Sequence, residues 1–158
     1  MKWTNYIIQG FSIWIIQILL SDLLSIDTVR PDFIVMLVLY WSIRDGRTVG
    51  VIGGFILGLM VDLSGASSYF GLSPMIYSTT GYLSGYLKGA YLNLNPFYFT
   101  ASWVGVICLH FIIFCFVFYQ DIWFINPGLY WAKWIGTSLY TLSFLGIIQI
   151  IYPLHRLD

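Results

Sequence analysis

Residues 50–89 read GVIGGFILGLMVDLSGASSYFGLSPMIYSTTGYLSGYLKG, and this stretch decides the fold. Its glycines recur every fourth residue in two runs, which are Gly50, Gly54 and Gly58, then Gly81, Gly85 and Gly89. Each run places its glycines on one face of a predicted helix. In water each interior glycine would cost a helix about 1 kcal/mol, but in lipid small residues let helix backbones approach closely. The pattern predicts a membrane bundle whose glycine faces pack helix on helix or receive a partner's helix.

The composition is typical of an integral membrane protein. The chain has 158 residues, of which 59% are hydrophobic, 20% aromatic and 9% charged. A soluble domain has about a quarter charged residues, so this chain carries too little charge to cover a water-facing surface. Its formal net charge is zero, which argues against nucleic acid as a partner, and it has no polybasic segment of the kind that binds anionic lipid. We expect a single domain over residues 1–158.

Six apolar segments predict an all-α bundle of six transmembrane helices, at about residues 3–24, 31–43, 48–63, 73–88, 96–119 and 128–152. A proline stands in the first turn of four of them, where its missing N–H does no harm; these are Pro31, Pro74, Pro96 and Pro127. Ser73, Asn95 and Asn126 precede three of these prolines as predicted N-caps. The stretch between the last two segments, residues 120–130, is predicted to be a loop on the outer surface.

Basic residues in the short loops predict the orientation. One side would carry Lys2, Arg44, Arg47, Lys88 and Arg156, and the other Arg30 and Lys133. The excess on the first side predicts that both termini are cytoplasmic.

Three charged residues form a predicted buried polar cluster, which consists of Arg30, Asp32 and Asp62. A carboxylate at the centre of a membrane helix costs about 2.5–3.5 kcal/mol on insertion scales. Asp62 therefore either reaches headgroup water or pairs with Arg30, because a hairpin through residues 44–47 would bring their helix ends together. Asp32 would complement the dipole at the start of its helix. Helical polar residues such as Gln17 and His110 are expected to form hydrogen bonds between helices.

No catalytic or metal-binding pattern is visible in the sequence. It has two histidines and two cysteines, Cys108 and Cys115, which are expected to be buried thiols. There is no phosphate-binding glycine loop, no metal-ligand cluster and no paired-carboxylate site. We therefore predict a protein that is not an enzyme and that needs no cofactor and no metal.

The order of motifs resembles one known family. Arg30-Pro31-Asp32 opens an apolar helix, residues 53–62 read GGFILGLMVD, and Gly71-Leu72 and Gly81-Tyr82-Leu83 follow. This arrangement resembles the rod shape-determining protein MreD family, most strongly over residues 30–90. The resemblance implies a multi-pass protein of the bacterial plasma (inner) membrane and a fold similar to the substrate-binding subunits of energy-coupling-factor transporters.

The same resemblance implies a function and partners. The chain would be a scaffold of the elongation machinery that inserts side-wall peptidoglycan, with MreC as its direct partner and with MreB, RodA and a class B penicillin-binding transpeptidase in the same assembly. Four outer aromatic residues are candidates for the contact surface: Tyr69, Phe70, Trp123 and Phe124. The alternative is a small-molecule-binding subunit of an energy-coupling-factor-type transporter, with a pocket lined by Asp32, Asp62, Tyr69 and Tyr77.

Overall fold

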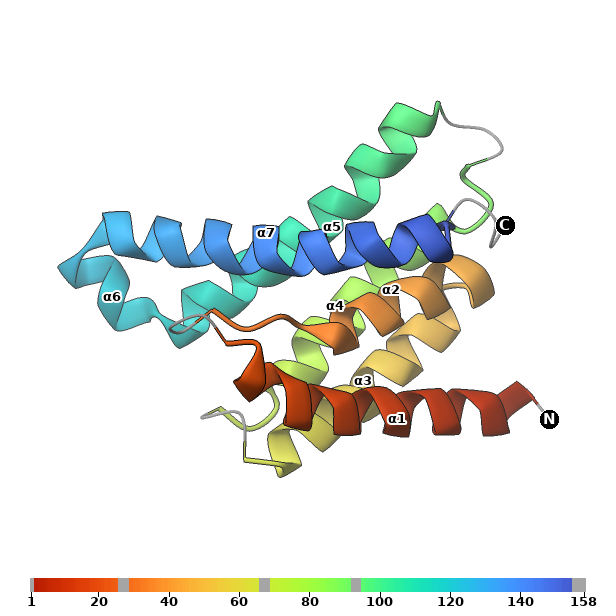
Figure 1. Ribbon diagram of the computed structural model, residues 1–158, viewed down its shortest axis with the longest axis horizontal. Helices are drawn as coiled ribbons and strands as arrows, with labels where there is room; N and C mark the ends of the chain where they lie inside the picture. Colours follow the sequence, from red (N-terminus) through yellow and green to blue (C-terminus); the bar gives the residue numbers. More distant parts are fainter. Residues whose placement is uncertain (1, 26–28, 66–68, 92–94, 155–158) are drawn as a thin grey trace.

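The computed structural model describes residues 2–25, 29–65, 69–91 and 95–154. Within these ranges it is helical and has no strand. The helices are α1 (Lys2–Leu23), α2 (Phe33–Asp45), α3 (Arg47–Leu63), α4 (Leu72–Ser84), the 3-10 helix η1 (Gly85–Leu87), α5 (Pro96–Phe118), α6 (Gln120–Ile125) and α7 (Pro127–Ile151). The prediction of an all-α protein is confirmed. Both chain ends lie at the same end of the bundle (Figure 1).

Three of the described helices are long and apolar enough to cross a membrane: Trp3–Leu20 within α1, α5 and α7. The helices α2, α3 and α4 have 13, 17 and 13 residues. They rise only about 20 to 26 Å, less than the roughly 30 Å of a hydrocarbon core. The expectation of six spans therefore stays a prediction.

The short helix α2 is the centre of the molecule. Its residues Ile34, Val35, Val38, Leu39 and Ile43 have no exposed surface. In Figure 1 it lies between α1 and α7, and it also packs against α3 and α4. An apolar helix that is covered over most of its surface needs no polar face, which explains why residues 33–41 are an unbroken hydrophobic run.

Local signals fix most helix ends. The Asp32 carboxylate caps α2, accepting hydrogen bonds from the amides of Ile34 (2.9 Å) and Val35 (3.0 Å). Asn95 and Asn126 cap α5 and α7 in the same way, and each is followed by proline. Gly46 separates α2 from α3 with a φ of 98°, a conformation that favours glycine.

Several boundaries differ from the expectation. Pro31 lies before the Asp32 cap of α2 and not in the first turn of that helix. The cap of α4 is Gly71 rather than Ser73, so the helix begins two residues earlier, and it ends at Ser84 rather than near residue 88. The stretch 120–130, expected to be a loop, contains α6 and the start of α7. Since α6 is only 6 residues long, it gives little apolar periodicity for a sequence pattern to show.

Candidate functional site

The glycine faces form the contact between α3 and α4. A Cβ atom at Gly54 would lie 2.6 Å from the Tyr77 carbonyl oxygen, and one at Gly58 would lie 2.5 Å from Pro74 Cα. Gly50 and Gly81 meet backbone to backbone. At Gly54, Gly58 and Gly81 the neighbours are main chain, which cannot rotate away as a side chain can, whereas Gly50 also faces the Ser42 side chain of α2. These glycines therefore set the distance between the two helices, and we call this contact the glycine seam.

The last two glycines of the second run behave differently. Gly85 closes the seam against Arg47, whose Cα would lie 2.5 Å from an added Cβ. Gly89 is not part of the seam, contrary to the predicted helical face. It follows η1 in a turn with a φ of 69°, and an added Cβ would meet no atom within 4 Å. The helix ends before Gly89, so this glycine provides a left-handed backbone conformation instead of close packing.

Asp32 is the centre of a buried polar network. One of its oxygens, Oδ1, caps α2, and the other, Oδ2, accepts a hydrogen bond of 2.6 Å from the Tyr77 hydroxyl of α4. The His110 ring of α5 lies 3.6 Å from the same Oδ2 through Nε2. Both carboxylate oxygens are therefore engaged within the fold, which is the arrangement that makes a buried carboxylate tolerable.

His110 extends the network towards α4. Its Nδ1 lies 2.8 Å from the Thr80 hydroxyl, which also donates to the Ile76 carbonyl oxygen. The His110 ring packs against Tyr77 with 5.2 Å between ring centroids. Both nitrogens of this buried histidine thus face polar atoms of the bundle.

Two further helices join at the Asp32 segment. The Gln17 side chain of α1 accepts a hydrogen bond from the Phe33 amide (2.8 Å) and donates one to the Pro31 carbonyl (3.1 Å). The Asp32 amide donates to the Thr141 hydroxyl of α7 at 3.3 Å. Five helices, namely α1, α2, α4, α5 and α7, meet in what we call the Asp32 network.

Sequence reasoning had named some members of this network and missed others. Asp32, Gln17, Tyr77 and His110 were each named from the sequence, and the pocket alternative places Asp32 with Tyr77, but no prediction joins all four. Thr80 and Thr141 were missed. Thr141 follows Ser138 and Thr137 by three and four residues, which places three hydroxyls on one face of α7. All three are buried, and this spacing is the signal that could have identified the face.

Asp62 lies apart from the Asp32 network at the end of α3. It is 6% exposed, and its Oδ2 accepts a hydrogen bond of 2.6 Å from the Gly71 amide at the start of α4. Its Oδ1 has no hydrogen-bond partner. The pair with Arg30 stays a prediction, since the hydrogen bond that the structure describes for Asp62 instead ties the end of α3 to the cap of α4.

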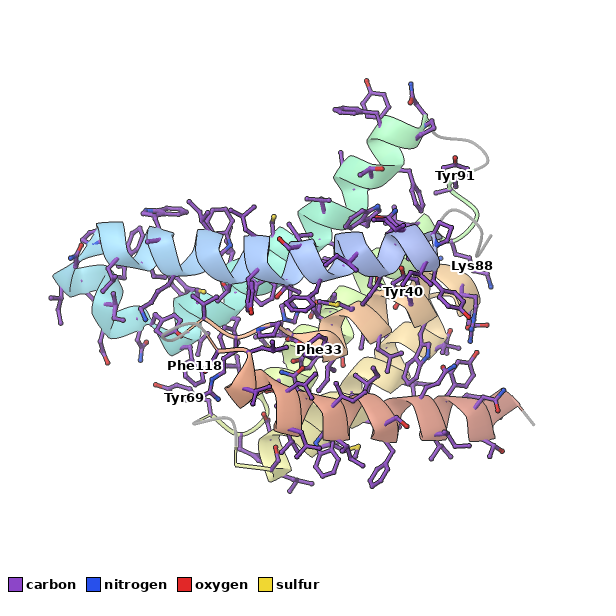
Figure 2. The ribbon with its side chains drawn as sticks, in the orientation of Figure 1. Phe33, Tyr40, Tyr69, Lys88, Tyr91 and Phe118 are labelled. Atoms are coloured by element: carbon purple, nitrogen blue, oxygen red, sulfur yellow. The ribbon has the colours of Figure 1, made fainter. Side chains whose placement is uncertain are left out.

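The four outer aromatic residues lie on two segments at the end of the bundle away from the termini. Phe70 is 72% exposed and Phe124 is 84% exposed. The two segments are linked, because Gln120 of α6 donates a hydrogen bond to the Tyr69 hydroxyl at 3.3 Å. Trp123 packs edge-on against Tyr130 of α7, with 5.0 Å between ring centroids. We call Tyr69, Phe70, Trp123 and Phe124 the outer aromatic surface; Tyr69 is labelled in Figure 2.

The polar groups described above contact other groups of the bundle. Among the described residues no three His, Cys, Asp or Glu side chains are grouped so that they could hold a metal ion. The carboxylates contact amides and a phenol, and the thiol of Cys115 is fully buried. The hydrogen bonds of Asp32 and Asp62 therefore join neighbouring helices.

The comparison with protein families identifies the chain. The model of the family described as rod shape-determining protein MreD matches residues 1–152. The chain belongs to the MreD family. It is therefore a member of a shape-determining protein family, and its three long apolar helices are those of a membrane protein. No curated protein and no solved structure matches the chain significantly, so the similarity to energy-coupling-factor subunits stays a prediction.

Proposed function

We propose that this MreD family member is a non-enzymatic scaffold of the bacterial cell-elongation complex that binds MreC and supports side-wall peptidoglycan synthesis. MreB, RodA and a class B penicillin-binding transpeptidase would be reached indirectly, through that complex. The observation that carries the proposal is the outer aromatic surface, which is exposed and is built from two segments joined by the Gln120–Tyr69 hydrogen bond. Exposed aromatic side chains are the usual anchors of protein interfaces.

The interior of the bundle supports the scaffold proposal, because the glycine seam and the Asp32 network are filled by contacts within the chain itself. The glycine seam is filled by the backbones of α3 and α4. The polar groups of the Asp32 network bond to one another. A partner would therefore bind the outside of a rigid frame, and the frame would hold the aromatic anchors in a fixed arrangement that lowers the entropic cost of binding.

The proposed topology is six spans of the plasma membrane with both termini in the cytoplasm. The two chain ends lie at one end of the bundle, together with the α2–α3 turn (Figure 1). That turn carries Arg44 and Arg47, and Lys88 donates a hydrogen bond to the Asp45 carbonyl within it. The positive-inside rule would make this end cytoplasmic and the outer aromatic surface extracytoplasmic. Arg156 lies outside the described residues.

The experiment is co-purification of MreC with the tagged full-length chain from membranes in mild detergent. The variant Phe70→Ser with Phe124→Ser removes two exposed anchors, and Phe97→Ser is the matched control, because Phe97 is also 72% exposed but lies at the start of α5. We expect the double variant to lose most of the MreC, at least tenfold if the two anchors together contribute about 2 kcal/mol. The control should retain it.

Two results would contradict the proposal. Undiminished MreC with the double variant would show that the outer aromatic surface is not the contact. A vitamin-sized molecule retained by the purified chain in native mass spectrometry, with no MreC bound, would favour the transporter-subunit alternative.

A further inference from the structure

A furrow runs along one side of α2, between α1 and α7. Its volume is about 350 Å³, and its lining comes from three helices: Gln9 and Ile13 of α1; Phe33, Met36, Leu37, Tyr40, Trp41 and Arg44 of α2; and Ile148 and Tyr152 beside α7. The α2 residues recur at helical spacing and so form a single stripe. From Phe33 to Arg44 this stripe is about 16 Å long.

The dimensions fit a hydrocarbon chain rather than a helix. A stripe of about 16 Å is close to half of the roughly 30 Å hydrocarbon core, which is the depth of one leaflet. An α-helix about 10 Å across would occupy roughly 80 Å² of cross-section, or about 1,300 Å³ over that length, which is more than the furrow holds. A row of methylene groups at van der Waals distance is about 4 to 5 Å wide, and therefore fits.

The walls and the end of the furrow differ in polarity. Ile13, Phe33, Met36, Leu37 and Ile148 are apolar, and the polar Gln9 accepts a hydrogen bond of 3.0 Å from the Trp41 ring within the lining. At the opposite end from Phe33 lies Arg44, whose side chain is 41% exposed. Figure 2 shows Phe33 and Tyr40 at successive positions along α2, with Lys88 towards the Tyr40 end.

The charges at that end favour an anion. Arg44 Nε bonds to Asp45 at 2.7 Å, but a guanidinium has five N–H donors. Lys88 Nζ lies 3.2 Å from the Asp45 carbonyl oxygen, whereas Arg47 at the start of α3 lies over the Tyr86 ring instead. Among the residues that the structure describes, the two cations Arg44 and Lys88 therefore outnumber the one carboxylate, Asp45, at this corner. The sequence shows no polybasic segment here, because Arg44 and Lys88 are far apart along the chain and come together only in the fold.

We propose that this furrow binds one acyl chain of an anionic phospholipid, with the lipid phosphate at the cationic corner against Arg44. The chain would lie along α2 and fill the space between α1 and α7. The lipid would thereby form part of the packing of α1, which contacts the rest of the bundle chiefly through α2. This inference depends on membrane insertion and not on the binding of MreC.

The test is native mass spectrometry of the full-length chain in mild detergent with added phosphatidylglycerol or phosphatidylcholine, two phospholipids that differ in net charge. We expect about fivefold or greater retention of phosphatidylglycerol over phosphatidylcholine. Arg44→Gln should lower that retention about fivefold, which corresponds to roughly 1 kcal/mol for one basic residue. Lys133→Gln is the charge-matched control at the opposite end of the bundle, and it should leave retention unchanged.

A second pair of variants tests the furrow itself. Ile148→Trp fills it, and Ile147→Trp adds the same bulk one residue away, at a side chain that is 59% exposed and does not line it. We expect Ile148→Trp to abolish the lipid adduct and Ile147→Trp to keep it. Protection of the Cys115 thiol from labelling verifies that each variant is folded. Equal retention of the two lipids would overturn the preference for an anionic headgroup, and retention unchanged by Arg44→Gln would overturn the phosphate contact. An adduct insensitive to Ile148→Trp would overturn the furrow.

Discussion

Substituting Gly54 by alanine is the most direct perturbation of the glycine seam. The added Cβ would lie 2.6 Å from the Tyr77 carbonyl oxygen, 2.7 Å from its carbonyl carbon and 3.0 Å from the Ser78 nitrogen. Ordinary contact begins at 3.4 Å, so α3 and α4 must separate by about 0.8 Å at this point. Because all three neighbours are backbone atoms, no change of rotamer can relieve the clash.

The cost follows from that separation. A gap of 0.5–1 Å removes about a quarter to a half of the dispersion energy of each contact that it opens, and overpacking a close-packed interior costs about 1–3 kcal/mol. Alanine is a better helix former than glycine by up to about 1 kcal/mol, which offsets part of this cost. We expect Gly54→Ala to lower the free energy of unfolding by about 1–2 kcal/mol, a change of roughly 5- to 30-fold in the population of unfolded chain.

The control is Gly105→Ala. Gly105 is also a helical glycine, in α5, but an added Cβ there would meet no atom within 4 Å. The same chemical change should therefore be neutral or stabilising by up to about 1 kcal/mol. The two variants differ only in whether a neighbouring backbone occupies the space.

Maleimide labelling of Cys115 measures the difference. The side chain of Cys115 has no exposed surface, so it reacts only when the bundle opens; Cys108→Ser removes the other thiol. In mild detergent the labelling rate follows the open population, and we expect Gly54→Ala to label about 5- to 30-fold faster than the parent. Equal rates for Gly54→Ala and Gly105→Ala would refute the seam as the constraint on helix spacing.

Three further predictions concern buried polar groups. Asp32→Ala removes both the cap of α2 and the acceptor for Tyr77, and should cost about 2–4 kcal/mol in the same labelling assay, while Asp32→Asn, which keeps an acceptor oxygen, should cost less. Gln17→Leu leaves the Phe33 amide and the Pro31 carbonyl unpaired and should cost about 1–3 kcal/mol. Asn5→Leu on the exposed face of α1 should change stability by under about 0.5 kcal/mol. Equal losses for the two variants would show that the Gln17 hydrogen bonds do not stabilise the bundle. Asp62→Asn should keep an acceptor for the Gly71 amide and change the free energy of unfolding by under about 1 kcal/mol. A loss of stability as large as that of Asp32→Ala would mean that the negative charge of Asp62 is paired with a cation.

Helix starts and the spacing of small residues could be predicted from the sequence, because each depends on only a few neighbouring residues. Asn95-Pro96 and Asn126-Pro127 start helices in the structure, because a side-chain cap and a fixed φ act within one turn. The four-residue spacing of Gly50, Gly54 and Gly58 placed them on one face for the same local reason. Gly89 has the correct spacing but lies beyond the end of α4, since spacing does not show where a helix stops.

Contacts between distant residues could not be predicted. Asp32 and Tyr77 are 45 residues apart, and Asp32 and Thr141 are 109 apart. The sequence predicts a cluster of Arg30, Asp32 and Asp62, because these charges flank a predicted hairpin, and the pocket alternative places Asp32 with Tyr77. In the structure the Tyr77 hydroxyl donates to Asp32 and the Gly71 amide donates to Asp62. These hydrogen bonds depend on how the helices are rotated and arranged.

The sequence by itself determined that this chain is helical, apolar and able to bring two helices into close contact, since hydropathy, capping and glycine spacing act locally along the chain. Only the tertiary structure decided which buried polar groups meet, that a Gln120–Tyr69 hydrogen bond joins the two outer aromatic segments, and that a furrow with a cationic end lies beside α2. These features are built from separate helices, and their geometry exists only once those helices have packed.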